Sequence, residues 1–329
     1  AKYPSKKRGQ SRLLRIHHEQ KHDENISDLL SFFKPNDLLV FNETKVFKAR
    51  LSLIKSSGGK AEILIIKKLS KYEALCLTKG IKKNKTKQKV LTQNFPVNIE
   101  ILKNEGKLLR IKFDQDIDKL CTAQGSMPIP PYLNRQSTAL DDDRYQSIFA
   151  NDVYNNSVAA PTASLHFDES LWQKVVNSVE TANINLDIGY GTFQPLDDDL
   201  IDQTTKLHQE SYDVPLETVK KIHNCKKNNG RVIALGTTTL RALESAVSED
   251  GDIVGGSNDT DIFIFDGYTF KVVDCLITNF HLPMSSLLML VSAFGGKANI
   301  LDAYEHAVSC GYKFFSYGDA MLIEECLSK

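Results

Sequence analysis

Two glycine-containing turns follow apolar runs and offer groups that can bind an anion. Gly236-Thr237-Thr238-Thr239 follows the run 231–235 and precedes a helical pattern. A turn between a strand and a helix exposes backbone amides at the helix N-terminus, and threonine hydroxyls add donors, so this turn suits a carboxylate or a phosphate. The simpler alternative is that Thr238 or Thr239 only caps the helix.

The second turn, Gly189-Tyr190-Gly191-Thr192, follows the strand-like segment 185–188. Its two glycines match the start of a dinucleotide-binding motif, but the third glycine is missing because position 194 is glutamine. The sequence therefore disfavours a dehydrogenase. The turn indicates either a second ligand-binding loop or an ordinary β-turn.

Four side chains could act as general acids or bases, namely His166, His208, Glu210 and His281. Such catalysis needs a positioned group whose pKa lies near the operating pH. His166 follows a stretch of small residues, 157–164, which indicates that something approaches the backbone closely there. His208 and Glu210 are two positions apart and share one face if the segment is extended.

Each of these residues also has a structural explanation. His166 could be a satisfied core histidine, and residues 208 and 210 could form an exposed, salt-linked edge. His281 ends a strand-like run and enters an apolar helix for which Ser285 is a plausible N-cap, so it could simply mark a helix start.

The sequence contains no pattern typical of a metal site. The six cysteines lie far apart, no C-x-x-C pair occurs and no zinc-type Cys/His spacing stands out. We therefore expect reduced thiols and no metal. The phosphate-binding P-loop, the nucleophile elbow, the H-E-x-x-H motif and the kinase signatures are also missing from the sequence.

The length and composition indicate a soluble, two-domain protein. The chain has 329 residues, 41% hydrophobic and 25% charged. A single core stops growing at roughly 250–300 residues, and these fractions are typical of globular proteins. The longest strongly apolar run, 285–294, is far shorter than the roughly 20 residues of a membrane span. No signal peptide opens the sequence, so we expect a cytoplasmic protein.

The net charge of zero hides an uneven distribution. Residues 1–125 hold 27 lysines and arginines against 13 acidic residues, whereas residues 126–329 hold 14 against 28. This polarity indicates that the first part meets a polyanion such as a nucleic acid. For the lysine run 82–89, a solvated loop is the alternative.

Hydrophobic patterning predicts two kinds of architecture. Short alternating stretches between 49 and 124 predict a small antiparallel β-barrel or sandwich. From 145 onward, strand-like and helical runs alternate, which is typical of an α/β fold. Proline-rich 127–135 predicts an extended connector. The expected strands after 145 are 184–188, 232–235, 261–265 and 272–277, and the expected helices are 168–179, 215–228, 240–247, 285–294 and 298–308.

These segments together resemble the S-adenosylmethionine:tRNA ribosyltransferase-isomerase family of queuosine biosynthesis. The resemblance covers essentially the whole chain, with residues 52–124 matching only by pattern. The matching segments are SRLL (11–14), DLLVFNETKVFKARL (37–51), MPIPPYLNR (127–135), RYQSIFA (144–150), SVAAPTASLHF (157–167), GYGTFQPL (189–196), LHQE (207–210), RVIALGTTTLRALESA (231–246), DIFIFDGYTFKVVDCLITNFHLP (261–283), SSLLMLVSAFGG (285–296) and FFSYGDAMLI (314–323).

The resemblance implies a discontinuous α/β main domain, 1–48 and 125–329, with a β-barrel domain, 49–124, inserted into it. It implies transfer and isomerisation of the ribosyl part of S-adenosylmethionine onto the 7-aminomethyl-7-deazaguanine wobble base of tRNA. The products would be epoxyqueuosine-tRNA, adenine and methionine. S-adenosylmethionine is then a consumed co-substrate, with no true cofactor, and we expect a monomer.

Roles within that reaction follow as hypotheses. His166, His208 or Glu210 would remove a proton from the ribose 5′ carbon, and His281 would protonate the leaving adenine. The methionine carboxylate or the ribose would be held by the two turns, completed from within the helix that follows the Gly236 turn; the residues are Gly189, Gly191, Thr192, Gly236, Thr237, Thr238, Arg241 and Glu244. The anticodon-loop phosphates would meet Arg8, Arg12, Lys45 and Arg50.

This sequence departs from the family pattern at four positions. The family usually has Gly at Ser164, His at Asp187, Arg at Gln194 and Lys at Met284. We assign positions 194 and 284 no role, and the change at 187 removes a candidate acid or base. The chain begins at Ala1 without methionine, and we expect a short leader to be missing. Two rival functions remain: a non-catalytic tRNA-binding module and a methyltransferase.

Overall fold

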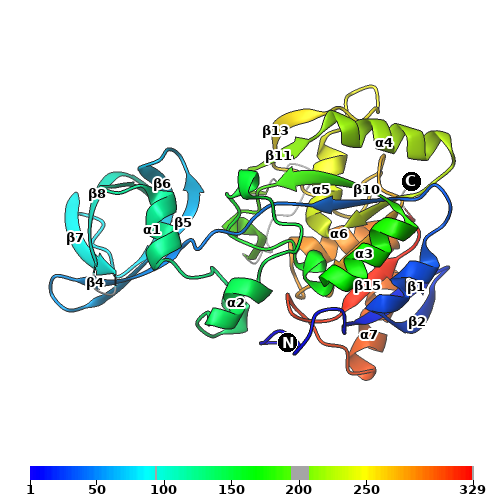
Figure 1. Cartoon of the computed structure of the whole chain (residues 1–329), viewed down its shortest axis with the longest axis horizontal. Coiled ribbons are helices and arrows are strands. Elements are labelled where there is room, and N and C mark those ends of the chain that lie inside the picture. Colours follow the sequence, from blue (N-terminus) through cyan, green and yellow to red (C-terminus); the bar gives the residue numbers. More distant parts are fainter. Residues whose placement is uncertain (93–94, 194–206, 328–329) are drawn as a thin grey trace. The chain divides into compact units, whose positions relative to one another are not determined.

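The computed structural model describes residues 1–92, 95–193 and 207–327 of the chain (Figure 1). The chain divides into two compact units. Unit 1 comprises residues 1–44, 147–154 and 160–329, and unit 2 comprises residues 45–146 and 155–159. The prediction of an α/β fold together with a closed antiparallel barrel is confirmed.

Unit 2 is larger than the segment predicted for the inserted domain, 49–124. Residues 125–146, predicted to belong to the main domain, group with the barrel. Ser126 exchanges two backbone hydrogen bonds with Arg50. The side-chain amide of Gln146 likewise bonds the backbone N–H and C=O of Val46. These non-local contacts draw the connector into unit 2.

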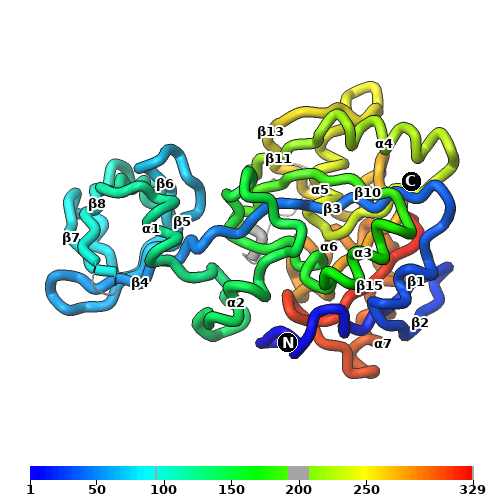
Figure 2. The backbone as a smooth tube through the Cα atoms, viewed as in Figure 1, coloured from blue at the N-terminus to red at the C-terminus, as the bar shows by residue number. Residues whose placement is uncertain are grey.

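A nine-stranded mixed sheet forms the centre of unit 1, in the order β13-β11-β10-β3-β12-β14-β15-β1-β2. Strands β10, β3, β12 and β14 are parallel, β15 is antiparallel to β14, and β1 is parallel to β15. Figure 2 shows the N-terminal strand β1 beside the C-terminal strand β15. The strands are β1 (Arg12–His17), β2 (Gln20–Asn25), β3 (Leu38–Asn42), β10 (Glu180–Leu186), β11 (Glu210–Val214), β12 (Val232–Leu235), β13 (Gly256–Thr260), β14 (Cys275–Asn279) and β15 (Ala320–Ile323).

Helices cover both faces of this sheet. On one face, Val175 of α3 belongs to the same buried core cluster as Leu39 and Ile277 of the strands. The residues before and after Leu39 in β3 point to the other face, because side chains alternate along a strand. Helices α4 and α5 contact β3 and the adjacent strands β10 and β12. The helices are α3 (Glu169–Ser178), α4 (Leu216–Lys227), α5 (Thr237–Ser245), α6 (Ser286–Gly295) and α7 (Lys297–Ser309), with 3₁₀ segments η1 (Ile26–Phe32), η3 (Asp152–Tyr154), η4 (Thr162–His166) and η5 (Tyr190–Phe193).

All five predicted helices form, with ends shifted by one to three residues. Asp168 and Ser285 cap α3 and α6, each accepting a hydrogen bond from an amide of the first turn. The predicted strand 261–265 is wrong. The polar segment Gly256–Thr260 pairs with β11 instead, while Phe263 and Ile264, although consecutive, are both buried in a loop.

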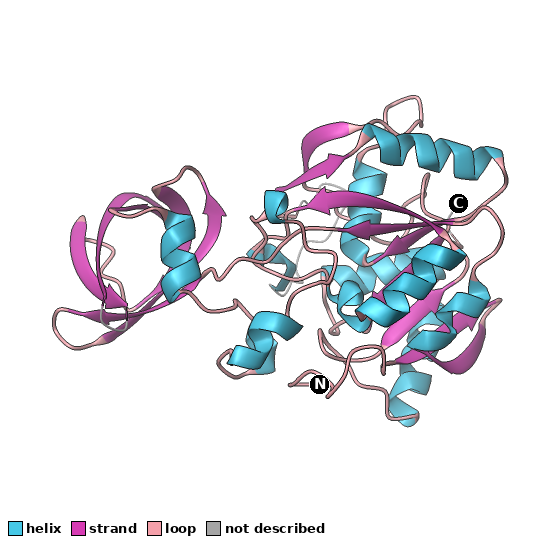
Figure 3. Cartoon of the chain, viewed as in Figure 1, coloured by secondary structure: helices cyan, strands magenta, loops and turns pink. Residues whose placement is uncertain are grey.

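Six antiparallel strands close the barrel of unit 2, in the order β4-β5-β6-β9-β8-β7 (Figure 3). Part of the lysine run is a strand, because β7 begins at Lys87 and pairs with both β4 and β8. The elements are β4 (Arg50–Lys55), β5 (Lys60–Lys68), β6 (Glu73–Lys79), β7 (Lys87–Thr92), β8 (Phe95–Glu105), β9 (Leu108–Phe113), α1 (Ile117–Gln124), η2 (Pro131–Leu133) and α2 (Ala139–Arg144). Among the described helices of either unit, none has the length and apolar character that a membrane span requires.

The register brings distant segments to one edge of the sheet of unit 1. The parallel strands β3, β10, β12 and β14 all end there, at Asn42, Leu186, Leu235 and Asn279. The strands that run the other way, β11 and β15, begin there at Glu210 and Ala320. In α/β sheets the crevice beyond the carboxyl ends of the strands is the usual ligand site. We call the end of the sheet at which these parallel strands finish the carboxyl edge.

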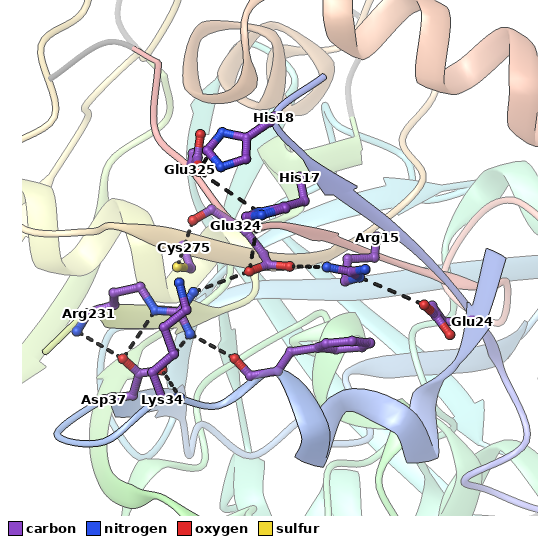
Figure 4. A network of polar contacts seen from close by, with 11 residues as sticks. Arg15, His17, His18, Glu24, Lys34, Asp37, Arg231, Cys275, Glu324 and Glu325 are labelled. Atoms are coloured by element: carbon purple, nitrogen blue, oxygen red, sulfur yellow. Dashed lines mark hydrogen bonds and ion pairs between the residues drawn. The ribbon is translucent and has the colours of Figure 1, made fainter. Parts of the chain in front are cut away.

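A network of charged side chains joins the strands at the opposite edge (Figure 4). Arg231, before β12, pairs with the buried Asp37, before β3, at 2.6 Å between Nη2 and Oδ2. Arg231 also reaches Glu324 after β15 at 3.3 Å, and Glu324 bonds Arg15 of β1 at 2.8 Å. Burial opposes the charge on Arg231, but hydrogen bonding to Asp37 raises its pKa. Four strands are thus tied together by ion pairs.

Candidate functional site

A buried ion pair lies at the carboxyl edge. Glu210, the first residue of β11, accepts a 2.5 Å hydrogen bond from Nη1 of Arg241 in α5, and both side chains are at most 4% exposed. The other carboxylate oxygen of Glu210 accepts the amide of Gly189 at 2.8 Å. Glu210 therefore fixes both the guanidinium and the glycine turn.

Arg241 keeps unused donors. Its Nε and Nη2 atoms are buried and have no hydrogen-bond partner within the described part of the chain. Leaving charged donors buried and unpaired costs more than a neutral unmade bond. A planar guanidinium with free N–H groups is the residue of choice for a carboxylate or a phosphate. The pair therefore points to an anionic ligand group.

A small cleft opens beside this pair. It is lined by Gly191, Leu207, His208, Glu210, Arg241, Ser286 and Leu287. A Cβ atom at Gly191 would lie 2.4 Å from Cδ2 of His208, so only glycine fits there without displacing the histidine. The structure thus brings together four of the predicted site residues and the Gly189 turn, although the side chain of Thr192 lies outside the described residues.

The other predicted turn begins α5. Gly236 has φ +94°, which favours glycine, and a Cβ there would lie 3.5 Å from Cβ of Ala163. Gly236 is itself the N-cap, so no N-cap side chain satisfies the first amides of the helix. The hydroxyl of Thr239 bonds the carbonyl of Leu235 at 2.8 Å. The alternative in which Thr238 or Thr239 caps the helix is therefore wrong. Thr237 and Thr238 lie in the first turn, both almost fully buried.

The small-residue segment places His166 at the same edge, in η4, with only 3% of its surface exposed. Its Nδ1 lies 2.7 Å from Oγ of Ser11, and its carbonyl accepts the amide of Gly9. Its Nε2 makes no hydrogen bond of good geometry among the described residues, although the Asn279 side chain lies within reach of the imidazole. Burial lowers the pKa of His166 to about 4, outweighing the opposite effects of Asp319 and Asn279. His166 is therefore a neutral imidazole with an unused nitrogen.

Sequence reasoning missed three polar residues at this edge: Ser11, Asn42 and Asn279. Asn42 bonds the backbone of Leu186 in both directions and donates to Oγ1 of Thr238 at 3.4 Å. Asn279 is buried, and its Oδ1 lacks a partner within the described chain. The available signal was their position, since each asparagine directly ends an apolar strand run.

Two predicted residues are occupied by structural contacts. Glu244 accepts the backbone amides of Lys271, Val272 and Val273 at 2.9–3.0 Å, so it anchors that loop. Nε2 of His281 lies 2.9 Å from Oγ1 of Thr278, and its backbone amide donates to the Tyr304 hydroxyl. Burial lowers the pKa of His281 to about 4 as well.

The predicted phosphate contacts are spread over both units. Arg12 stacks its guanidinium 3.7 Å from the centre of the Tyr312 ring and donates to the Cys310 carbonyl, so its side chain serves the fold of unit 1. Arg50, in unit 2, pairs with Glu62 at 2.5 Å. Arg8 lies in unit 1 with a buried Nη1, and Lys45 lies in unit 2 with an intermediate exposure.

Three of the four positions that differ from the family pattern lie in the described part of the chain. Ser164 is fully buried with a hydroxyl that lacks a partner in the described residues. Asp187 accepts from Nδ2 of Asn185 at 3.1 Å, and Met284 is 68% exposed. Gln194 lies outside the described residues.

The chain is similar to known proteins over nearly its whole length. The family described as Queuosine biosynthesis protein matches residues 1–323. The S-adenosylmethionine:tRNA ribosyltransferase-isomerase of Nitrosomonas eutropha is 44% identical, over 98% of this chain and 94% of that protein. The Acinetobacter baylyi protein of the same name is 43% identical, over 99% and 96%. The crystal structure of S-adenosylmethionine tRNA ribosyltransferase from Thermotoga maritima is similar at a TM-score of 0.54 and 31% identity, covering 98% of this chain and 95% of that one.

Proposed function

This chain belongs to the queuosine biosynthesis protein family, and we propose that it is a S-adenosylmethionine:tRNA ribosyltransferase-isomerase. It transfers the ribosyl moiety of S-adenosylmethionine to the 7-aminomethyl-7-deazaguanine wobble base of tRNA and isomerises it. Epoxyqueuosine-tRNA forms, and adenine and methionine leave. The enzyme acts as a cytoplasmic monomer and consumes S-adenosylmethionine as a substrate.

The observation that carries the site assignment is the buried Arg241. Its unused Nε and Nη2 donors adjoin a cleft at the carboxyl edge, and the methionine carboxylate of S-adenosylmethionine is the anion they bind. Glu210 holds the guanidinium in place from the other side. The uncapped N-terminus of α5 offers further amide donors to the ribose hydroxyls or the same carboxylate.

His166 is the base that we assign to the first step. The sulfonium group makes the hydrogens of the adjacent 5′ carbon acidic, and a neutral imidazole with an unused Nε2 can accept one of them. Glu210 is a poorer candidate, since one of its oxygens accepts from Arg241 and the other from Gly189. His208 lines the cleft and is the alternative base.

Adenine then leaves, and the amine of the tRNA base attacks the sugar. The departing adenine needs a proton, but a histidine whose pKa is about 4 carries none to spare near neutral pH. We therefore do not retain His281 as the donor; the proton that His166 takes from the 5′ carbon in the first step is the one that passes to adenine. Aligning two large substrates can lower the barrier by about 7–11 kcal/mol, so positioning contributes much of the rate.

The proposal is tested by identifying the small-molecule products. The purified chain is incubated with S-adenosylmethionine and tRNA that carries 7-aminomethyl-7-deazaguanine, and the products are separated by mass spectrometry. Adenine and methionine in equal amounts, with a matching mass increase on the tRNA, are expected. S-adenosylhomocysteine would instead identify a methyltransferase, and tRNA binding without any product would identify a binding module.

A further inference from the structure

We propose that Asp23, His306 and Cys310 form a binding site for a Zn²⁺-like divalent cation in unit 1. Asp23 lies on β2, His306 in the last turn of α7, and Cys310 directly after that helix. Their ligand atoms, one from each side chain, all lie within 4.8 Å of one another. None of the three lines the substrate cleft, so the site is separate from the proposed reaction.

The distances match those around a tetrahedral ion. Nε2 of His306 is 3.1 Å from Oδ2 of Asp23 and 3.6 Å from Sγ of Cys310. Zinc bonds are about 2.0–2.2 Å to nitrogen or oxygen and about 2.3 Å to sulfur, so neighbouring ligands in a tetrahedron are about 3.3–3.6 Å apart. Two of the three separations are already near those values, the ligand atoms of Asp23 and Cys310 lie within 4.8 Å of each other, and a water molecule would complete the tetrahedron.

One nitrogen of His306 faces both partners, which argues against a catalytic triad. In a triad the nucleophile and the carboxylate contact different ring nitrogens. Here Nε2 faces both the thiol and the carboxylate. A single N–H or lone pair can serve only one of them well, whereas an ion between the three atoms is bound by all of them.

Outer contacts hold the ligands as they do in metal sites. The second oxygen of Asp23, Oδ1, accepts from the Tyr312 hydroxyl at 2.6 Å and from Arg12 at 3.2 Å, which directs Oδ2 to the cluster. The Ser309 hydroxyl donates to the His306 carbonyl at 2.8 Å and lies 3.8 Å from Sγ of Cys310.

The charges of the cluster suit a dication. In the bound state a carboxylate and a thiolate would supply two negative charges to the ion, and coordination would release the thiol proton to solvent. The sequence alone predicts no metal site, although His306 and Cys310 are four positions apart and therefore lie on one side of a helix end. The third ligand is 283 positions earlier than His306, and only the fold brings it close.

Cobalt(II) tests this proposal without reference to catalysis. The metal-free full chain is titrated with Co²⁺, and the thiolate-to-cobalt charge-transfer absorption is recorded. One equivalent should produce the band, and Zn²⁺ should abolish it by competition. Cys310→Ser should remove the band, while Asp23→Asn and His306→Ala should weaken binding by at least about tenfold.

Two variants serve as matched controls. Cys326→Ser removes another accessible thiol, and His18→Ala removes a histidine from the cluster of His17, His18 and Glu325, which contains no sulfur. Both should leave the titration unchanged. The proposal is overturned if the wild-type chain gives no band, if Cys310→Ser keeps it, or if either control variant abolishes it. Loss of this site would leave the assignment of the substrate cleft untouched.

Discussion

The chemistry of the carboxyl edge depends on a few residues whose polar atoms are buried but not used within the described chain. Nε2 of His166, Oδ1 of Asn279 and two donor nitrogens of Arg241 share this property. Buried polar groups are nearly always paired in native proteins. Several unpaired groups at one edge of a sheet are therefore expected where a ligand completes the pairing.

Replacing His166 should stop the reaction without unfolding the site. His166→Gln keeps a polar side chain of similar size but cannot accept a proton, so kcat should fall by about 10²–10⁴. S-adenosylmethionine affinity, measured by calorimetry, and tRNA affinity, measured by filter binding, should be nearly unchanged. Adenine release is the direct readout.

The pH profile of the wild-type enzyme checks the same assignment. Burial places the pKa of His166 at about 4, below its ordinary value of 6.5. A base must be unprotonated, so kcat/KM should hold as the pH falls through 6.5 and decline only as it approaches 4. If His208→Ala abolishes adenine release while His166→Gln does not, the base is His208.

Arg241→Lys separates binding from chemistry. Lysine keeps the charge but lacks the planar array of donors, so it cannot serve Glu210 and a carboxylate together. KM for S-adenosylmethionine should rise by about 10–100-fold with kcat changed little, as expected for binding energy shared by ground and transition states. A fall in kcat at constant KM would mean that Arg241 does not hold the methionine carboxylate.

At the scale of elements, the sequence predicts the helices better than the strands, because helix formation depends on residues close together in the chain. The five helices were found because apolar residues recur at helical spacing and because Asp168 and Ser285 are good caps. Strand β7 was missed because it begins within the lysine run and only two of its residues, Val90 and Thr92, are buried. Polar β13 was missed for a related reason, since an edge strand needs pairing with β11 rather than apolar side chains.

The candidate site was predictable only in parts. The Gly189 turn, Glu210 and Arg241 were each identifiable by residue type, but their hydrogen bonds depend on β11 pairing with β10. The contact between Ser11 and His166 spans 155 positions and rests on how η4 packs. Residue types at strand ends are visible in a sequence, whereas the partner across the sheet is not.

Gly191→Ala should narrow the cleft. Its new methyl group would meet the His208 ring at 2.4 Å, so the histidine must move into the space the ligand needs. We expect a rise of about tenfold or more in KM for S-adenosylmethionine, with the thermal midpoint little changed because His208 is exposed. Gly189→Ala is the paired variant, since its Cβ would make an ordinary 3.5 Å contact with Glu210. Its effect should be the smaller one.

The ion-pair network at the opposite edge should govern stability rather than activity. Asp37→Asn leaves the partly buried Arg231 without its main partner, and breaking a buried pair costs about 3–5 kcal/mol. Urea unfolding followed by circular dichroism would report this loss. Lys220→Met, which removes an exposed pair with Glu217 on α4, should change stability by no more than about 0.5 kcal/mol. Equal losses of unfolding free energy in the two variants would mean that the buried Asp37–Arg231 pair stabilises the fold no more than an exposed pair does.

At the scale of the whole molecule, the family match extends through both units, so the barrel is part of the matched protein rather than an addition. The charge is divided along the chain, with a basic first part and an acidic remainder. A polyanion as long as tRNA is recognised largely through its phosphates. Basic residues on unit 2 are then expected to raise tRNA affinity without reading its sequence.

Charge reversal in the lysine run tests whether basic residues of unit 2 contribute to tRNA affinity. Lys83, Lys85 and Lys87 are exposed residues of unit 2, and changing all three to Glu should weaken tRNA binding. For each phosphate that the variant no longer neutralises, the slope of log K against log salt should flatten by about 0.7–0.9, because fewer counterions are released on binding. Reversing Lys174, Lys220 and Lys227 makes the same change in net charge on exposed helix positions of unit 1. Equal losses of affinity from both triple variants would show that only the total charge matters, and no change from the first would make the run a solvated surface. A larger loss of affinity and slope from the first variant alone would locate phosphate contacts on the barrel.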